Sequence, residues 1–556
     1  MKNSSRDRRN SAVGVLIIIP LLMAFFRIDS GRAQEAPPRT IAGVPAEEAL
    51  RQGEKMYREG ILPSGEPVQA VVKGDIPVSG TAFTCVSCHQ RSGLGSIEGN
   101  VITPPTNGRN LFQPLRIRYK RFKLERPVAY TDESLAEALR GGVDPSGRVM
   151  NDVMPRYLLE DKDMALLISY LKSLSSQFSP GVSDTAIRFA TVISEGVSPE
   201  DRDAMLVTLQ NWSKRIWHIG WGDAVDDKAT ALFRLHRILS VWVLKGPPET
   251  WRSQLEEYNR KEPAFALLGG ITTGEWKPIH DFCEENRIPS LFPLTDFPVI
   301  SETDWYTLYF SKGYYQEGEG AARHLNRISE QLHGKAIVQI VRDSREGHAL
   351  SEGFQKTWRD MGHPAPVTIT LKEGQPLTKE ILQKVSAEEK PAVLILWGGP
   401  EVLPPLETFA AGKNRPEMVF ISSGYIGQDI WTLKEEVREF TYITYPFRFS
   451  QGGEIRRASV EPFMKKAKSQ GNQEMILKRT YSLTTVLSQV LMDMRGNFYR
   501  DNFLDVIGMM EDKDLPLYER LSFGPGQRYA SKGCYIVQLS KGPEPELIKK
   551  SDWVIN

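Results

Sequence analysis

The sequence of 556 residues is poor in cysteine, with only four, at positions 85, 88, 283 and 534. Small exported proteins held together by disulfides use many more cysteines in a shorter chain, so a disulfide scaffold is excluded. For Cys283 and Cys534, far apart in the sequence, we expect two buried thiols, with a disulfide between them as the alternative. Histidine is also scarce, and His89 is the only one among the first 200 residues.

Excess charge and long apolar runs are missing too. The formal net charge is +1 at pH 7, which gives no basic surplus of the kind that nucleic-acid-binding proteins carry. After residue 33 no apolar run reaches the roughly 20 residues that a membrane-spanning helix needs. The chain also lacks a Gly-x-x-x-x-Gly-Lys-Ser/Thr phosphate loop, a Gly-x-Ser-x-Gly elbow and a His-Glu-x-x-His zinc motif, which removes the best-marked enzyme classes from the prediction.

The first 33 residues have the layout of a signal peptide. Basic residues between positions 2 and 9 precede an apolar stretch at 12–26, and Gly31 and Ala33 provide the small residues of a cleavage site. The apolar stretch is short for a full span, so cleavage is favoured over the alternative, an uncleaved membrane anchor. The mature protein is therefore expected in the periplasm.

One motif carries specific chemistry: Cys85-Val86-Ser87-Cys88-His89. In an exported chain, Cys-x-x-Cys-His indicates covalent haem attachment, with both cysteine sulfurs bound to one haem and the histidine bound to its iron. A redox Cys-x-x-Cys would open a helix in a strand–helix–strand context, whereas turn residues surround this motif. We therefore predict one haem c, attached through Cys85 and Cys88, with His89 as an axial ligand.

The second axial ligand is sought among three methionines, because no other histidine lies nearby. Met164 belongs to an apolar helical stripe and is expected in the core. Met154 stands directly before Pro155, which stiffens the loop, so we predict Met154 as the ligand and keep Met150 as the alternative. A histidine–methionine haem has no open position for a substrate, which favours one-electron transfer.

The hydrophobic pattern changes near residue 185. Before it, helices are predicted at 45–57, 132–140 and 161–174. After it, apolar strands alternate with helices, one of which is predicted at 319–329. The predicted strands are 187–193, 238–244, 265–268, 336–341, 367–371, 392–396 and 418–421. The sequence thus predicts a small all-α domain at 46–176, a linker at 177–185 and a bilobed, doubly wound α/β domain at 186–556, after the signal peptide at 1–33.

Residues 46–176 resemble a class I cytochrome c domain. The resemblance rests on Gly53 and Tyr57 in the first helix, the haem motif, Met154-Pro155, and Tyr170-Leu171 in the last helix. It implies that the first and last helices cross through a glycine and an aromatic residue. It also implies that a backbone carbonyl in a proline-containing loop orients His89, and Pro104 or Pro105 would supply it.

Residues 186–556 resemble type 1 periplasmic binding proteins, the branched-chain amino-acid receptors of ABC importers. The similar segments are 267–274, 287–293, 313–318 and 523–528. The resemblance implies a ligand site made by Thr272, Thr273, Thr295 and Tyr315, for an amino acid or another carboxylate. The glycine-rich turn at 269–274 suits a carboxylate because it offers backbone N–H groups and two hydroxyls beyond a strand end. For each of these residues, a turn or core role is the alternative.

The predicted function is that of a periplasmic mono-haem cytochrome fused to a small-ligand-binding domain. Two alternatives remain: a periplasmic redox enzyme that oxidises its ligand and passes the electrons to haem, and a haem-bearing ligand sensor. Expected partners are a periplasmic redox protein, the small-molecule ligand, and a membrane transporter or oxidoreductase; nucleic acid is not expected.

The motif yields a direct test. Haem held by two thioether bonds should stay with the denatured protein during acid–acetone extraction, at one haem per chain, measured as a pyridine haemochrome. Replacing both Cys85 and Cys88 by alanine should make any bound haem extractable. Haem that leaves the unaltered protein freely would contradict covalent attachment.

Overall fold

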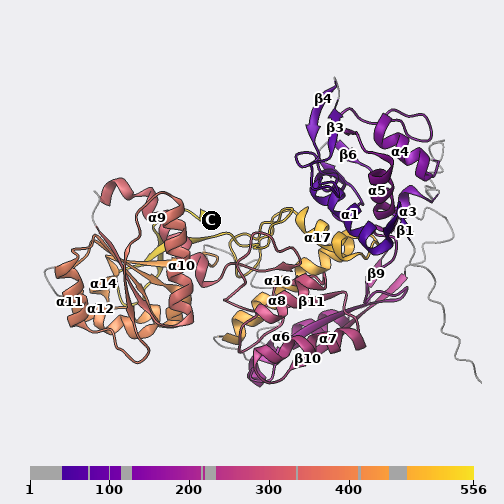
Figure 1. Ribbon diagram of the computed structural model, residues 1–556. Helices are drawn as coiled ribbons and strands as arrows, with labels where there is room; N and C mark the ends of the chain where they lie inside the picture. The colour runs from indigo at the N-terminus through magenta and orange to yellow at the C-terminus, as the bar shows by residue number, and fades with distance from the viewer. Residues whose placement is uncertain are drawn as a thin grey trace, which may run out of the picture.

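The computed structural model describes residues 40–72, 75–98, 101–113, 128–214, 217–219, 233–332, 336–410, 415–449 and 472–555. The predicted signal peptide, residues 1–33, lies outside this described part. Figure 1 shows three bodies: an N-terminal domain at the upper right, a central lobe (lobe 1) and a second lobe at the left (lobe 2). Within the described residues, no helix combines the length and apolar character needed to cross a membrane.

The N-terminal domain is mainly helical, as predicted. Its helices are α1 (Ala46–Glu59), α2 (Cys85–His89), α3 (Gly108–Leu111), α4 (Asp132–Gly141) and α5 (Asp161–Ser173). The sequence did not reveal a small antiparallel sheet in the order β4-β3-β7, made by β3 (Gln69–Val72), β4 (Ile76–Ser79) and β7 (Arg156–Tyr157). Two of its strands lie between α1 and the haem motif. The alternation of apolar and polar residues there is too short to predict a strand.

The core of this domain is built where α1 crosses α5. At Gly53 a Cβ atom would stand 2.5 Å from the carbonyl oxygen of Leu166 and 2.6 Å from the Cβ of Tyr170, so only glycine allows this approach. One turn further on, the rings of Tyr57 and Tyr170 pack with their centroids 5.5 Å apart. The implied crossing through a glycine and an aromatic residue is therefore present.

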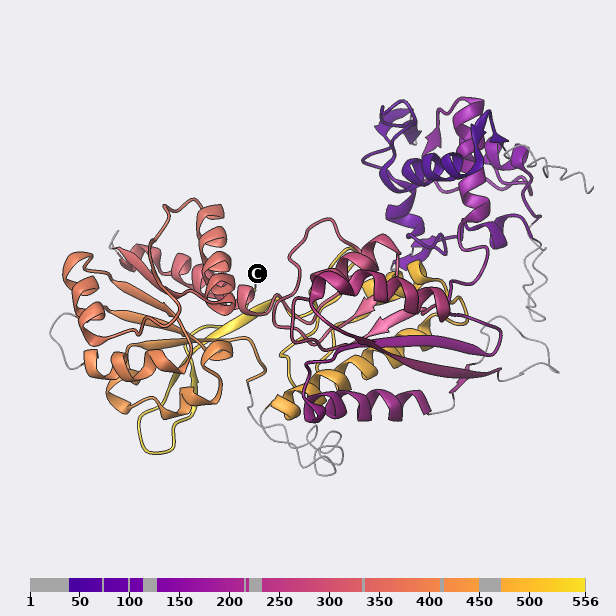
Figure 2. The same cartoon turned by 60° about the horizontal axis from the view of Figure 1, so that its bottom comes forward.

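Lobe 1 is a parallel sheet with one antiparallel edge strand, in the order β13-β12-β11-β8-β10-β9. Its strands are β8 (Ala186–Ser194), β9 (Trp217–Ile219), β10 (Phe233–Leu244), β11 (Ala266–Leu268), β12 (Ser290–Leu291) and β13 (Thr307–Leu308). Its helices include α6 (Pro199–Lys214), α7 (Trp251–Lys261), α8 (Lys277–Glu285), α16 (Asn472–Asp493) and α17 (Arg500–Gly508). Phe189 of the central strand β8 pairs with Leu239 of β10 and Ala266 of β11, and helices cover both faces (Figure 2).

Lobe 2 is a second sheet, in the order β15-β14-β16-β17-β18-β19-β20, with β21 also paired to β19. Its strands are β14 (Ile337–Arg342), β15 (Val367–Leu371), β16 (Val393–Trp397), β17 (Met418–Ser422), β18 (Thr441–Tyr445), β19 (Gly533–Leu539), β20 (Leu547–Lys549) and β21 (Val554–Ile555). Helices around it include α9 (Tyr314–Arg327), α10 (Arg345–Asp360), α11 (Lys379–Glu388), α12 (Leu403–Ala410), α13 (Ser423–Ile426) and α14 (Glu435–Arg438). All seven strands predicted in the α/β region are present, within a residue or two except at the start of β10.

The chain passes between the lobes three times: after β13, after β18, and between α17 and β19. Each lobe is therefore assembled from segments distant in sequence, and the last residues complete the sheet of lobe 2. Cys283 on α8 and Cys534 on β19 are free, fully buried thiols in different lobes. This agrees with the expected pair of buried thiols and not with the disulfide.

The helix crossing can be tested by adding a methyl group at Gly53, where the two helices approach closely. Gly53→Ala should lower the free energy of unfolding of the N-terminal domain by about 1–3 kcal/mol, because the added methyl overpacks the α1–α5 contact. Gly141→Ala, at the end of α4, is the matched control, since its Cβ would meet nothing within 4 Å. Denaturant unfolding followed through haem absorbance measures both; equal stability of the two variants would contradict the crossing.

Candidate functional site

His89 ends the short helix α2 and is buried, with 5% of its surface exposed. Its Nδ1 lies 2.8 Å from the carbonyl oxygen of Pro104. A carbonyl only accepts, so Nδ1–H donates, and the other ring nitrogen, Nε2, keeps a lone pair for a metal. Burial lowers the pKa of His89, which favours the neutral imidazole that metal binding requires. Of the two prolines that the sequence left open, the structure selects Pro104.

A hairpin brings that carbonyl back to His89. The chain turns at Gln90, where φ is +65°, and the amide of Gly95 donates to the carbonyl of His89 at 3.1 Å. Strands β5 (Ser96–Glu98) and β6 (Val101–Thr103) then pair and end at Pro104. Gly95 has φ +77°, and a Cβ there would stand 2.1 Å from the oxygen of Thr103, so the closing of the hairpin needs glycine.

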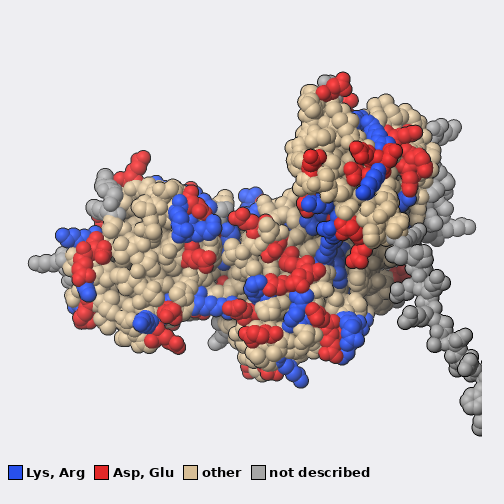
Figure 3. All heavy atoms as spheres, viewed as in Figure 1, with Lys and Arg blue, Asp and Glu red and all other residues tan. Residues whose placement is uncertain are grey.

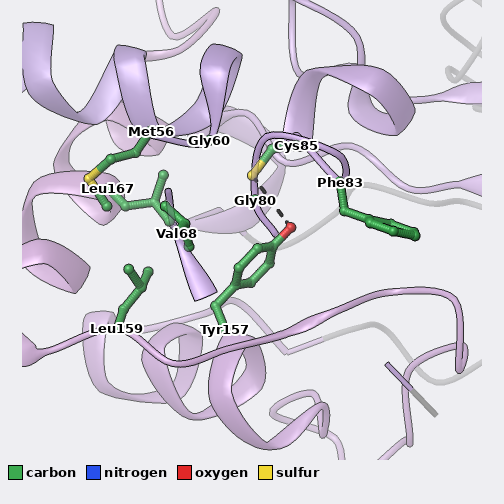
Figure 4. Close-up of a pocket in the computed structure, with 9 residues that line it drawn as sticks. All are labelled: Met56, Gly60, Val68, Gly80, Phe83, Cys85, Tyr157, Leu159 and Leu167. Atoms are coloured by element: carbon green, nitrogen blue, oxygen red, sulfur yellow. Dashed lines mark hydrogen bonds between the residues drawn. The ribbon is translucent and has the colours of Figure 1, made fainter. Parts of the chain in front are cut away.

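An apolar crevice lies beside the motif (Figure 4). Its lining residues are Met56, Gly60, Val68, Gly80, Phe83, Cys85, Tyr157, Leu159 and Leu167. The sulfur of Cys85 and the hydroxyl of Tyr157 point toward one another across it, 3.8 Å apart. Cys88, three residues on, is exposed. One cysteine thus lines the crevice, and the other lies at the surface, next to the histidine in the sequence.

The methionine loop is tied to the same core. Its amide at Met150 donates to Gly142 at 2.8 Å, and the guanidinium of Arg156 donates to the carbonyls of Met150 and Met154. Met154 is partly buried and packs against the apolar core of the domain, whereas Met150 is not part of that cluster. Of these two methionines, only Met154 therefore packs against the apolar core of the domain.

Large apolar side chains stand exposed on the two elements that carry Pro104 and Met154. On the hairpin, Ile97 and Ile102 are 70% and 72% exposed; on the loop, Val149 and Val153 are 69% and 65% exposed. Clustered exposure of this kind normally marks a surface that something covers. Exposed apolar side chains on the segments that carry the predicted ligands are what a large apolar group such as haem would cover, so the residues present fit this group.

Three of the four predicted ligand residues lie on adjoining loops of lobe 1. Thr273 follows β11, and its amide donates to the hydroxyl of Ser194, which ends β8, at 3.0 Å. The loop after β12 is joined to this turn by a hydrogen bond from the amide of Leu294 to the carbonyl of Gly270, at 2.9 Å. Thr272 and Thr295 lie on these two loops. The hydroxyl of Thr272 donates to the carbonyl of Gly274, and that of Thr295 accepts from the amide of Phe297, so both bonds stay within the loops.

The fourth residue, Tyr315, does not join them. Its side chain is buried, with the ammonium of Lys312 5.8 Å from the ring centroid, and its backbone carbonyl packs against Gly353 of α10. Its neighbour Tyr314 is half-buried, with its ring centroid 5.1 Å from that of Phe297 in lobe 1 and 6.2 Å from that of Tyr425 in lobe 2. Tyr314 is thus the aromatic residue at the lobe boundary. The sequence placed the start of this helix at 319 instead of 314, and so gave no helical phase for the two tyrosines.

Sequence reasoning also missed Glu317. This carboxylate is buried and accepts hydrogen bonds from the hydroxyls of Thr444 at 2.6 Å and Ser422 at 2.9 Å, and from the amide of Gly424 at 3.1 Å. Burial raises the pKa of Glu317 to about 7, against the effect of these donors. The bonds fix the turn that carries Tyr425, so Glu317 supports the lobe 2 side of the boundary.

A buried histidine with a free Nε2, two cysteines beside an apolar crevice and a methionine loop define a c-type cytochrome domain. Two α/β sheets with loops at the lobe boundary define a solute-receptor fold. The comparisons agree with both: the cytochrome c family matches residues 80–175, and the family described as periplasmic binding protein matches residues 245–543. The second match spans more than half of the chain, so this protein belongs to the periplasmic binding protein family and carries a cytochrome c domain ahead of it.

Similar solved structures are distant in sequence. One is a putative branched-chain amino acid ABC transporter protein from Rhodospirillum rubrum, at 12% identity and TM-score 0.48, covering 67% of this chain and 100% of that one. A second, from Thermus thermophilus with bound valine, has 12% identity, TM-score 0.47 and coverages of 68% and 97%. A solute binding protein from Rhodopseudomonas palustris BisB5, in complex with 3,4-dihydroxy benzoic acid, has 12% identity, TM-score 0.46 and coverages of 67% and 98%. Such likenesses concern the fold alone, and no curated protein matched the chain.

Proposed function

We propose that this protein is a periplasmic mono-haem c-type cytochrome whose electron-transfer domain is fused to a receptor for a small ligand. The observation that carries the proposal is the buried imidazole of His89, with Nδ1–H donated to Pro104 and Nε2 left for iron. Cys85 and Cys88 would attach the haem covalently. When bound, the haem supplies a reversible one-electron carrier.

The chain's own residues set the properties of that carrier. The carbonyl of Pro104 fixes the imidazole tautomer and its orientation, which keeps the ligand nitrogen aimed in one direction. The apolar crevice lined by Met56, Val68 and Leu167 excludes water. Met154, on a loop held by Arg156, would be the second iron ligand, and a haem bound by both residues would have no position for a substrate.

Met154→Ala tests the second ligand. The variant should lose the methionine-to-iron charge-transfer band at the red edge of the visible spectrum of the oxidised protein, and its midpoint potential should fall, because thioether ligation raises it. Met150→Ala is the matched control from the same loop and should keep the band. A band that disappears only in Met150→Ala would assign the ligand to Met150.

For the receptor, we propose that the ligand is an amino acid or another carboxylate, bound as the lobes close. The support is chemical: the loops after β8, β11 and β12 present the hydroxyls of Ser194, Thr272, Thr273 and Thr295 at the carboxyl ends of parallel strands. Tyr314 takes the place that the sequence gave to Tyr315, since it lies at the lobe boundary. Partners would be a periplasmic redox protein and a membrane transporter or oxidoreductase.

If the receptor binds its ligand without converting it, the ligand should raise the melting temperature of the protein. A compound at 100 times its Kd should stabilise the folded protein by about 2.7 kcal/mol, and a panel of amino acids and aromatic carboxylates can be screened by this shift. The double variant Thr272→Ala/Thr273→Ala should reduce the shift of an active compound and leave the haem spectrum unchanged. Thr370→Ala, an exposed threonine on β15, is the control and should keep the full shift.

The same assay separates the receptor from the enzyme. A receptor returns the compound unchanged and leaves the oxidation state of the haem as it was. Consumption of the compound in step with haem reduction, measured anaerobically in one sample, would replace the receptor function by that of a periplasmic oxidoreductase.

A further inference from the structure

The N-terminal domain is docked on lobe 1 through a network of charged groups. Figure 1 shows α17 lying directly against the N-terminal domain near α1, and Figure 3 shows basic and acidic side chains side by side at this junction. Arg58 of α1 binds Asp501 of α17 at 2.8 Å, and the hydroxyl of Tyr306 donates to the same carboxylate at 3.1 Å. Glu54 of α1 accepts two bonds from the guanidinium of Arg287, at 2.7 and 2.9 Å.

One carboxylate at this junction binds the turn that directly follows the haem motif. Asp505, on the same face of α17, is 8% exposed and accepts the backbone amide of Ser92 at 2.8 Å and that of Arg91 at 3.3 Å. These amides belong to the second and third residues after His89. The carbonyls of this turn are bonded within the N-terminal domain, by the hydroxyl of Tyr57 to Gln90 at 2.7 Å and of Ser175 to Ser92 at 2.7 Å.

The two domains therefore share the turn that holds the histidine. The cytochrome domain satisfies the carbonyls and the receptor domain satisfies the amides. The guanidinium of Arg91 extends the contact outward and stacks on Trp305 of lobe 1, with its carbon 4.1 Å from the ring centroid. A buried charge acts more strongly on its surroundings than one in water, because the local dielectric is low.

We propose that Asp505, a residue of the receptor domain, is a positioning and potential-setting residue of the cytochrome: it holds the turn after His89 and lowers the haem midpoint potential. The proposal rests on the proposed ligation of haem by His89. Its physical basis is that oxidation adds a positive charge at the iron, and a nearby buried carboxylate stabilises that charge. The potential of the haem is then set partly from outside the cytochrome domain.

The charge on Asp505 can itself be varied. Burial raises the pKa of Asp505 to about 6, against the amide donors of Ser92 and Arg91, so the carboxylate is ionised at neutral pH and protonated in mild acid. The titratable groups that interact with it are Tyr57 on α1 and Asp501 on α17. Asp501 in turn binds Arg58 and lies 3.9 Å from the guanidinium of Arg91. The haem potential should thus fall as the pH rises through about 6, where Asp505 ionises.

The test is a redox titration of the full-length holoprotein. Asp505→Asn keeps the shape and removes the charge, so the midpoint potential at pH 7.5 should rise. The fall in potential between pH 5 and 7 should become smaller in this variant than in the unaltered protein. Asp505→Glu keeps the charge and should restore a potential close to the original. Asp493→Asn, an exposed carboxylate on α16, is the control and should leave the potential unchanged.

Docking is measured in the same samples by small-angle scattering. Asp501→Asn weakens the junction at Arg58 but leaves the two amide bonds from the haem turn to Asp505 in place. Unchanged potential and pH dependence in Asp505→Asn would overturn the proposal, as would an equal shift in Asp501→Asn. Should Asp505→Asn separate the domains, the docked Asp505→Glu variant decides: a potential far from the original would also overturn it. If the unaltered protein shows no methionine-to-iron charge-transfer band, the proposed haem ligation itself is wrong.

Discussion

The hydrogen bond from His89 to the carbonyl of Pro104 constrains most of the N-terminal domain. A buried imidazole needs a partner for its N–H, and a backbone carbonyl provides one that holds the tautomer fixed. To bring that carbonyl into place, the chain needs the positive φ at Gln90, the glycine at position 95 and the β5–β6 hairpin. The crossing of α1 and α5 also stabilises this turn, because the hydroxyl of Tyr57 on α1 donates to the carbonyl of Gln90 at 2.7 Å.

The segment between the domains works as a packed connection rather than a free tether. The hydroxyl of Ser175 is bonded to Ser92, Phe178 packs on Phe498 and Tyr499, and the amide of Ser179 donates to the carbonyl of Phe498. The linker predicted at 177–185 was inferred from turn-forming residues, which mark a change of direction but carry no information on mobility. Together with α17, these contacts make the cytochrome domain an extension of lobe 1.

The sequence predicted the features that depend on local pattern. These features are the haem motif, the helices at the start and end of the first domain, and the seven apolar strands. Each can be predicted from the spacing of its apolar residues or from a short motif. It could not choose between Pro104 and Pro105, because that choice depends on how a hairpin folds back. It selected Tyr315 where Tyr314 lies at the lobe boundary, because one residue of helical phase decides which side chain turns outward. Glu317 and Asp505 gave no signal at all: their partners, Thr444 and Ser92, are more than a hundred residues away.

The attachment to lobe 1 has a consequence for how the two halves of the protein could communicate. Lobe 2 meets lobe 1 near Phe297, which Tyr314 approaches to 5.1 Å and over which the guanidinium carbon of Arg345 lies at 4.0 Å. All contacts of Asp505 described above, by contrast, are made by lobe 1 and the cytochrome domain. If lobe 2 closes on a ligand as a rigid body, its position relative to the cytochrome domain changes. The hydrogen bonds at the haem turn stay in place. Ligand binding would then act on the approach of a redox partner rather than on the haem potential, because the bonds between Asp505 and the haem turn do not change.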